Sequence, residues 1–275
     1  MKLKIFFLAL TLVLAAALCF AGPQDEAPAA GADAEGEVYG GTLTVLHQRS
    51  MGDPPSPAQG DCQVQAIDGW LAAMQEHLLQ GNIKEYGGMG NGEFLFEFSD
   101  YIPMKYITGH LIESWEVTPE RAILNVRPGV YWSADHVDWM ESRELTAEDI
   151  AFDINFFRTA SWGSRFDGVL DEDSVYAEDK YTVVCEFVNF NNQFLYYVGW
   201  EDRSVYSPPE LEENNSQLWE NQVGTGPFVI DSYTIGSSMT FTRNDNYWNS
   251  TVIDGEEYPM PFVDRSVFPI IPDAG

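Results

Sequence analysis

Histidine and cysteine, the side chains that most often carry chemistry in proteins, are few in this sequence and follow no recognised spacing. The histidines are His47, His77, His110 and His136, and none lies in an HExxH pattern, which would hold zinc on one helix face. The run DHVD at residues 135–138 places an imidazole between two carboxylates, a set that could bind a metal ion. We expect this run to lie in a surface insertion and predict no metal site.

Nucleophilic and glycosidic catalysis are not indicated either. The sequence contains neither a GxSxG nucleophile turn nor cysteines paired at zinc-site spacing. Its 43 acidic residues make a close carboxylate pair a matter of chance, so such a pair is no evidence of a glycosidase. Cys62 and Cys185 could form a disulfide in an oxidising compartment, and the sequence leaves their pairing open. We therefore predict a protein that is not an enzyme and uses no cofactor.

Charge and composition exclude further classes. With 14 basic and 43 acidic residues, the net charge is −29 and the isoelectric point is near 4.1. Such a chain lacks the cations that nucleic acids and anionic lipids require, so we expect neither as a partner. The 275 residues, 45% of them apolar, suffice for about two domains or one large one.

The first 21 residues have the features of a secretory signal. Lys2 and Lys4 precede an apolar run over residues 5–20, which is short for a membrane span, and Ala21 supplies the small residue before a cleavage site. A lipoprotein signal with Cys19 acylated is the alternative. Residues 22–36 carry no large apolar side chain, so we expect a disordered linker over residues 22–39 in an exported protein.

Hydrophobic periodicity predicts the elements that would position binding residues. Alternation indicates strands at residues 41–46 and 93–98. Apolar residues at three- and four-residue steps from Val64 to Leu78 predict a helix that ends at Gly81. Residues 111–117 and 122–126 should form an antiparallel pair across a short turn.

A second helix should begin after Thr146, whose hydroxyl can cap its first turn. The expected buried face of this helix contains Ala147, Ile150, Ala151, Ile154 and Phe157. Further strands are expected at residues 181–187, 228–233 and 239–242. Helices and strands mixed in this order predict an α/β fold, and the short hairpins predict mixed sheets.

Three groups of motifs stand in a fixed order along most of residues 40–273. They are LIESWE, NVRPGV and LTAEDI at residues 111–116, 125–130 and 145–150, then VGTGPF and RNDNYW at 223–228 and 243–248, and finally VDR and IIPD at 263–265 and 270–273. This set resembles the family 5 extracellular solute-binding proteins. Members of that family are the ligand-capturing subunits of ABC importers for oligopeptides, dipeptides and nickel.

The resemblance implies a periplasmic-binding-protein-like fold of type II, a hinged clamp, of which only the N-terminal part is present. Residues 40–60 and 198–275 would form an incomplete lobe I, and residues 61–197 a subdomain of that lobe that is specific to the family. Family members continue well past the IIPD motif, so the second lobe is expected to be missing and the chain to be a fragment. Residues 134–143 are longer than the family's turn, and we expect a surface insertion there.

The family's cleft segments map onto eight residues of this chain. By position they are His47, Gln48, Arg49 and Met51 after the first strand, Trp162 and Arg165 after the capped helix, and Trp200 and Arg203 farther along. An arginine can hold a carboxylate through two hydrogen bonds, and a tryptophan can stack on a ligand. Gly224 and Gly226 are expected to allow a tight turn through positive φ, and residues 244–248 to act as scaffold.

The resemblance therefore implies capture of oligopeptides or dipeptides in the periplasm or at the outer face of the cytoplasmic membrane. The captured ligand would close the two lobes, and the closed form would dock on the ABC permease subunits. An oligosaccharide ligand in the same family, or a secreted acidic hydrolase, remains an alternative. Membrane contact is expected only through a lipid anchor at Cys19.

Overall fold

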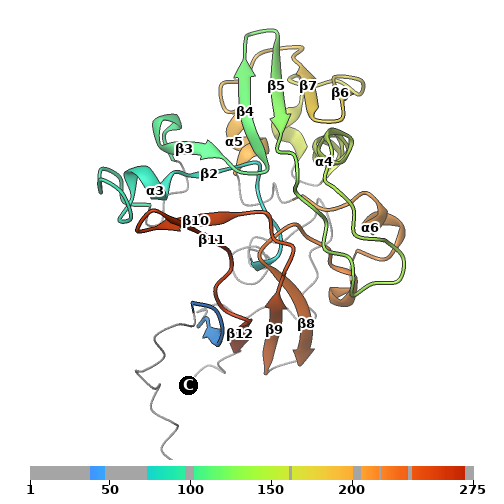
Figure 1. Ribbon diagram of the computed structural model, residues 1–275. Coiled ribbons are helices and arrows are strands. Elements are labelled where there is room, and N and C mark those ends of the chain that lie inside the picture. The colour runs from blue at the N-terminus through green and yellow to red at the C-terminus, as the bar shows by residue number, and fades with distance from the viewer. Residues whose placement is uncertain are drawn as a thin grey trace, which may run out of the picture. The chain divides into compact units, whose positions relative to one another are not determined.

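Two four-stranded sheets organise the described part of the chain (Figure 1). In the computed structural model this part comprises residues 38–46, 73–96, 102–160, 163–200, 206–216, 218–234 and 237–269. The expected signal over residues 1–21, the linker up to residue 37 and the start of the helix predicted from Val64 lie outside it. No helix within these ranges has the length and apolar character needed to cross a membrane.

The first sheet joins segments that are far apart in the sequence. Its strands lie in the order β1 (Thr42–Thr44), β12 (Arg265–Pro269), β9 (Ser238–Arg243) and β8 (Phe228–Thr234). Strand β1 runs parallel to β12, whereas the other neighbours are antiparallel, so the sheet is mixed as predicted. The strands expected at residues 41–46, 228–233 and 239–242 are confirmed.

The second sheet is antiparallel and built mostly from neighbours in sequence. Its order is β4 (Ile112–Val117), β5 (Arg121–Val126), β7 (Thr182–Glu186) and β6 (Val175–Asp179). The predicted hairpin is confirmed, and its turn closes where the Thr118 N–H donates to the Arg121 carbonyl oxygen at 2.8 Å. The strand expected at residues 181–187 is β7.

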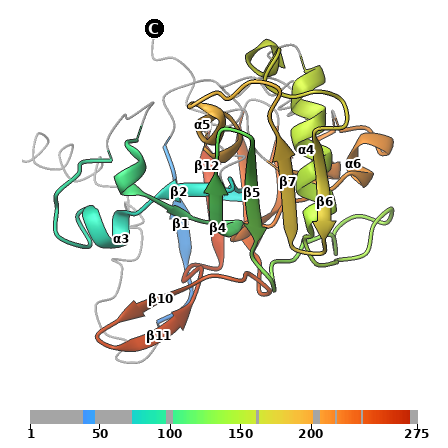
Figure 2. The ribbon, with the colours of Figure 1, turned by 90° about the horizontal axis from the view of Figure 1, so that it is seen from above.

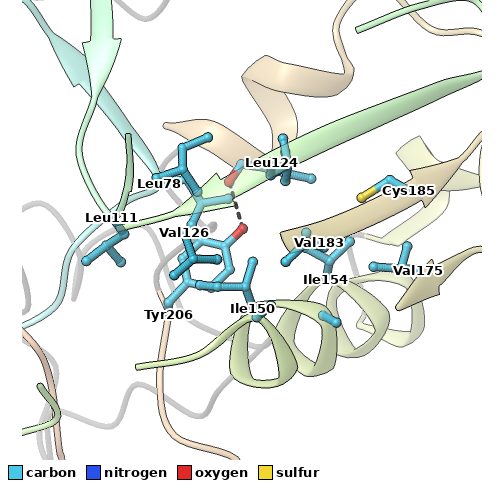
Figure 3. Close-up of a cluster of buried hydrophobic side chains, with 14 of the residues drawn as sticks. Leu78, Leu111, Leu124, Val126, Ile150, Ile154, Val175, Val183, Cys185 and Tyr206 are labelled. Atoms are coloured by element: carbon cyan, nitrogen blue, oxygen red, sulfur yellow. Dashed lines mark hydrogen bonds between the residues drawn. The ribbon is translucent and has the colours of Figure 1, made fainter. Parts of the chain in front are cut away.

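Helix α4 (Ala147–Thr159) packs against strands β6 and β7 of this sheet (Figure 2). It begins with the predicted cap, because Thr146 and Asp149 form a capping box in which the Thr146 N–H donates to Asp149 Oδ2 at 2.8 Å. All five residues expected on its buried face are buried. Figure 3 shows Ile150 and Ile154 directed at the sheet, and burying each such side chain contributes about 1.5–3 kcal/mol.

Two small sheets and short helices complete the described fold. Strand β2 (Leu79–Gly81) pairs with β3 (Ile107–Gly109), and β10 (Ser250–Ile253) pairs with β11 (Glu256–Pro259). The remaining helices are α3 (Ile83–Tyr86), α5 (Phe194–Gly199) and α6 (Glu210–Glu213), with 3-10 turns η2 (Met104–Tyr106), η3 (Gly163–Phe166) and η4 (Trp219–Asn221).

Two of the predicted elements are wrong where the structure describes them. The helix expected to reach Gly81 is absent from its last turns, because residues 75–77 are irregular and β2 follows. Leu78 and Leu79 are both fully buried there. A short apolar segment that is buried on both sides cannot be distinguished from part of a buried helix by the spacing of its apolar residues. Residues 93–96 alternate as predicted but form no strand, since Phe94 stacks on Tyr106 at 4.4 Å instead of joining a ladder.

Residues 134–143, where we expect a surface insertion, lie at the surface in part, since Asp135, His136, Asp138, Glu141 and Ser142 are exposed, but the segment is also anchored to the core. Ala134 is 1% exposed, and Trp139 packs against the main hydrophobic core. Arg143 ties the end of this segment to the helix beside it through paired hydrogen bonds to Asp149 at 2.7 and 2.9 Å, and it binds Glu210 in the same way. The segment is therefore part of the packed fold.

A buried carboxylate, Glu76, connects three separate parts of the chain. It is 5% exposed and accepts hydrogen bonds from Thr225 at 2.8 Å, Tyr247 at 2.8 Å and Trp248 at 3.0 Å, while His110 Nε2 lies 2.6 Å from its Oε1. We call these five residues the Glu76 hub. The hub fixes the segment before β2 against the VGTGPF and RNDNYW motifs, and Tyr247 and Trp248 hold it there; that residues 244–248 act only as scaffold stays a prediction.

The two motif glycines are needed for close backbone packing and not for a turn with positive φ. Gly224 and Gly226 do not have positive φ, which corrects the expectation from sequence. A Cβ at Gly224 would lie 1.9 Å from the Met74 carbonyl oxygen, and one at Gly226 would lie 2.7 Å from the same atom. The Gly226 N–H donates to this carbonyl at 2.8 Å. Only glycine lets the two backbones approach so closely.

Candidate ligand-binding site

The structure describes two of the eight residues predicted to contact a ligand, Arg165 and Trp200. The other six lie outside the described residues; they are His47, Gln48, Arg49, Met51, Trp162 and Arg203.

Arg165 lies on η3, directly after α4. Gly163 allows this turn, because a Cβ there would lie 2.3 Å from the Arg158 carbonyl oxygen at the end of α4. Phe166 is 2% exposed and anchors the turn in the core. The Arg165 guanidinium is half-buried and lies 5.0 Å from the centre of the Tyr197 ring, a cation–π distance.

Trp200 is the residue that ends α5. Its N–H donates to the Tyr196 carbonyl oxygen at 3.3 Å, and its indole packs edge-on against the Tyr196 ring at 5.4 Å. The indole Nε1–H is buried and meets no hydrogen-bond acceptor within the described residues. A buried donor without a partner costs about 1–3 kcal/mol, so this N–H would gain from any acceptor that reaches it.

The two predicted residues are joined by two tyrosines that sequence reasoning missed. Tyr196 and Tyr197 lie 5.6 Å apart between ring centres, so Arg165, Tyr197, Tyr196 and Trp200 are successive neighbours. We call these four residues the Arg165–Trp200 row. The run FLYYVGW at residues 194–200 is the signal that could have identified the tyrosines, although adjacent aromatics there also resemble core.

The row combines three capabilities in partly exposed side chains. A guanidinium binds carboxylates through two parallel hydrogen bonds. Tyrosine and tryptophan faces accept apolar groups by stacking, and the indole N–H, which has no partner within the described ranges, can donate to a carbonyl. Such a set suits a ligand with a carboxylate, amide groups and apolar side chains.

The described residues offer no metal centre. Within the described ranges no three histidine, cysteine, aspartate or glutamate side chains are placed to hold an ion. His136 Nε2 donates to the Gln222 carbonyl oxygen at 2.9 Å, and partial burial lowers the pKa of His136. Asp135 accepts a hydrogen bond from Ser142 at 2.7 Å.

The one described cysteine shows no sign of catalytic activation. Cys185 on β7 is a free, fully buried thiol. Burial raises its pKa strongly, which suppresses the reactive thiolate. Cys62 lies outside the described residues.

Comparison with known proteins identifies the fold and the family. Residues 107–275 match the family "Bacterial extracellular solute-binding proteins, family 5 Middle". In structure, the chain is similar to the periplasmic binding protein DppA from Helicobacter pylori in complex with peptide STSA. The TM-score is 0.62 at 20% identity, over 86% of this chain and 44% of that one. For AppA from Bacillus subtilis in complex with a nonapeptide, the TM-score is 0.58 at 20% identity, over 86% and 41% of the two chains.

Two proteins of Escherichia coli are similar in sequence. The probable ABC transporter periplasmic-binding protein SapA is 27% identical over 175 residues, covering 57% of this chain and 32% of SapA. The dipeptide-binding protein is 28% identical over 183 residues, covering 60% and 32%. The chain thus spans about a third of the length of these curated relatives. The expected periplasmic-binding-protein-like fold, present in part, is confirmed, and the chain belongs to the family 5 bacterial extracellular solute-binding proteins.

Proposed function

We propose that this chain captures oligopeptides or dipeptides for an ABC importer, as part of its substrate-binding component. Family membership supports this proposal, as do relatives named for dipeptide binding and for peptide complexes. These names favour peptides over the oligosaccharide and hydrolase alternatives. Capture involves no covalent step, so the protein acts as a binding protein and not as an enzyme.

The observation that carries the proposal is the Arg165–Trp200 row. A peptide presents a terminal carboxylate that the Arg165 guanidinium can hold and backbone carbonyls that can accept from the unpartnered Trp200 Nε1–H. Its side chains vary, and the tyrosine faces tolerate variation because stacking on an aromatic ring requires no fixed partner. His47, Gln48, Arg49, Met51, Trp162 and Arg203 complete the proposed site.

Partners and location follow from the same role. The ligand-bound protein would dock on permease subunits at the outer face of the cytoplasmic membrane, after export directed by residues 1–21. A lipid anchor at Cys19 stays a prediction. We also propose the lobe division predicted from sequence, and the sheets support it: β1, β8, β9 and β12 fall in residues 40–60 and 198–275, whereas β4 to β7 fall in residues 61–197.

The test measures the binding of di- to pentapeptides to the whole chain. Saturation-transfer NMR is the method, because it detects weak complexes. We expect a saturable signal from the parent protein. Arg165→Ala should weaken the peptide affinity about tenfold or more, because it removes a charge-assisted hydrogen bond. Trp200→Phe should keep the stacking and weaken binding less. Arg121→Ala, at an exposed position on β5, is the matched control. Equal losses in R165A and R121A, or no saturable peptide signal at all, would contradict the proposal.

A further inference from the structure

A second candidate binding site lies away from the residues that correspond to the family's cleft segments. A cavity of about 550 Å³ opens between the turn after η3 and the loop that follows β7. Its lining includes Asp167, Gly168, Asn189, Phe190, Asn191 and Asn192. The hollow is shallow and widely open to solvent, and its volume is sufficient for one small ligand.

Local hydrogen bonds hold the two walls of this pocket together. Gly168 has φ +68°, a backbone conformation that side-chain-bearing residues rarely adopt, so the first wall turns sharply there. Its carbonyl oxygen accepts from Asn189 Nδ2 of the second wall at 2.7 Å. The Val188 N–H donates to the Val169 carbonyl oxygen at 2.9 Å, beside the first contact. The pocket therefore has a defined shape before any ligand arrives.

The polar groups of the pocket are only partly used by the protein. The Asp167 carboxylate and the Asn192 amide have no hydrogen-bond partner among the described residues. Asn191 uses its Oδ1 to accept from the Gln193 N–H at 2.9 Å, which leaves its Nδ2 donors available, and Asn189 keeps its Oδ1. The lining therefore offers both hydrogen-bond donors and hydrogen-bond acceptors.

An aromatic face completes the pocket. Phe190 is 49% exposed, although a ring of this kind gains free energy from burial. Phe187 holds it in place, with the two ring centres 5.9 Å apart, and Phe187 in turn packs edge-on against the buried Phe194 at 4.8 Å. Phe190 therefore exposes part of its surface beside carboxylate and amide groups.

From this combination we propose that the pocket binds a neutral saccharide. Sugar hydroxyls both donate and accept, so they match Asp167, Asn191 and Asn192, while the C–H face of a sugar ring stacks on Phe190. Among the described residues no cation lines the pocket, and the chain carries a net charge of −29, so an anionic ligand is disfavoured. A single carboxylate is a weak basis for selecting a cation. This site is independent of peptide capture and would hold the protein to a polysaccharide.

The test uses the whole chain in native gels cast with and without hydroxyethyl cellulose, xylan or soluble starch, together with saturation-transfer NMR on cellotriose, xylotriose and maltotriose. We expect retardation or saturable transfer with at least one of these saccharides. Phe190→Ala and Asn192→Ala should each weaken binding about tenfold. Asn192 is exposed and has no hydrogen-bond partner in the part of the chain that the structure describes, so the change should not impair folding. Tyr131→Ala, which removes another exposed aromatic ring outside the pocket, should leave binding unchanged.

Three results would overturn the inference: no response to any saccharide, equal loss in Y131A, or trialanine competing for the pocket as well as the sugars do. The two sites are separate if F190A abolishes sugar binding but not peptide binding, and R165A abolishes peptide binding but not sugar binding.

Discussion

Replacing Glu76 by glutamine tests whether the Glu76 hub stabilises the fold as its geometry indicates. The amide keeps the shape of the side chain, but its NH2 group replaces one of the two carboxylate oxygens, each of which faces two hydrogen-bonding groups. Trp248 Nε1–H can only donate, so the amide oxygen should stay opposite Trp248 and Thr225. The NH2 group then faces His110 and Tyr247.

The expected cost follows from what each of these two groups can do. The tyrosine hydroxyl can rotate and accept. His110 must present a bare Nε2 and carry its proton on Nδ1, which is buried without a partner among the described residues. The variant thus loses a hydrogen bond to a charged group and gains an unpaired buried donor, which together should lower the free energy of unfolding by about 3 kcal/mol.

Urea unfolding followed by circular dichroism measures this difference, provided that the slope with denaturant stays constant. Glu113→Gln, at an exposed position on β4, is the control and should change the free energy of unfolding by less than about 0.5 kcal/mol. His110→Gln should be destabilising as well, and its effect should not add to that of E76Q because both act on one contact. An E76Q protein within about 0.5 kcal/mol of the parent would refute the reasoning.

Three further changes have definite expected outcomes. Gly224→Ala should destabilise by at least about 2 kcal/mol in urea unfolding, because its Cβ would lie 1.9 Å from a backbone carbonyl oxygen, whereas Gly88→Ala, with nothing within 4 Å, should be close to neutral. The pKa of Glu144 is lowered from 4.5, first by its hydrogen bond to Lys180, so its carboxylate stabilises the fold above pH 4.5 and this contribution is lost as the pH falls through the lowered value. Glu144→Gln should therefore unfold at lower urea than the parent at pH 7, and the two midpoints should converge well below pH 4.5; a constant difference would contradict this. In a variant with the other cysteines replaced by serine, Cys185 should react with a thiol reagent only after unfolding, and rapid native labelling would show that the thiol is accessible.

Elements whose signals lie within a few residues could be predicted from the sequence. The α4 helix was predictable because Thr146 and Asp149 are three residues apart and its apolar residues repeat on one face. The hairpin of β4 and β5 was predictable because a short turn separates two alternating runs. The segment ending in β2 could not be predicted in this way, because burial of Leu78 and Leu79 depends on distant partners.

Features that depend on contacts between distant segments could not be predicted in this way. Nothing in the spacing of Glu76 indicates that it meets Thr225 and Trp248, so the hub has no local signature. Gly224 was expected to allow a tight turn. It is required instead because the backbone of Met74, which is distant in sequence, lies too close for a Cβ atom. In the candidate site, resemblance located Arg165, but the tyrosines between it and Trp200 became visible only once α5 was known.

The parallel pairing of β1 with β12 has a consequence for how the polypeptide acquires its structure. The two strands come from opposite ends of the described sequence, so closing the contact confines a very long loop and is entropically slow. The hairpins of the β4–β7 sheet involve far shorter loops and can form while synthesis continues. Strand β1 therefore stays an unpaired edge until residues 265–269 have been made, and only then can its backbone groups find their partners in β12.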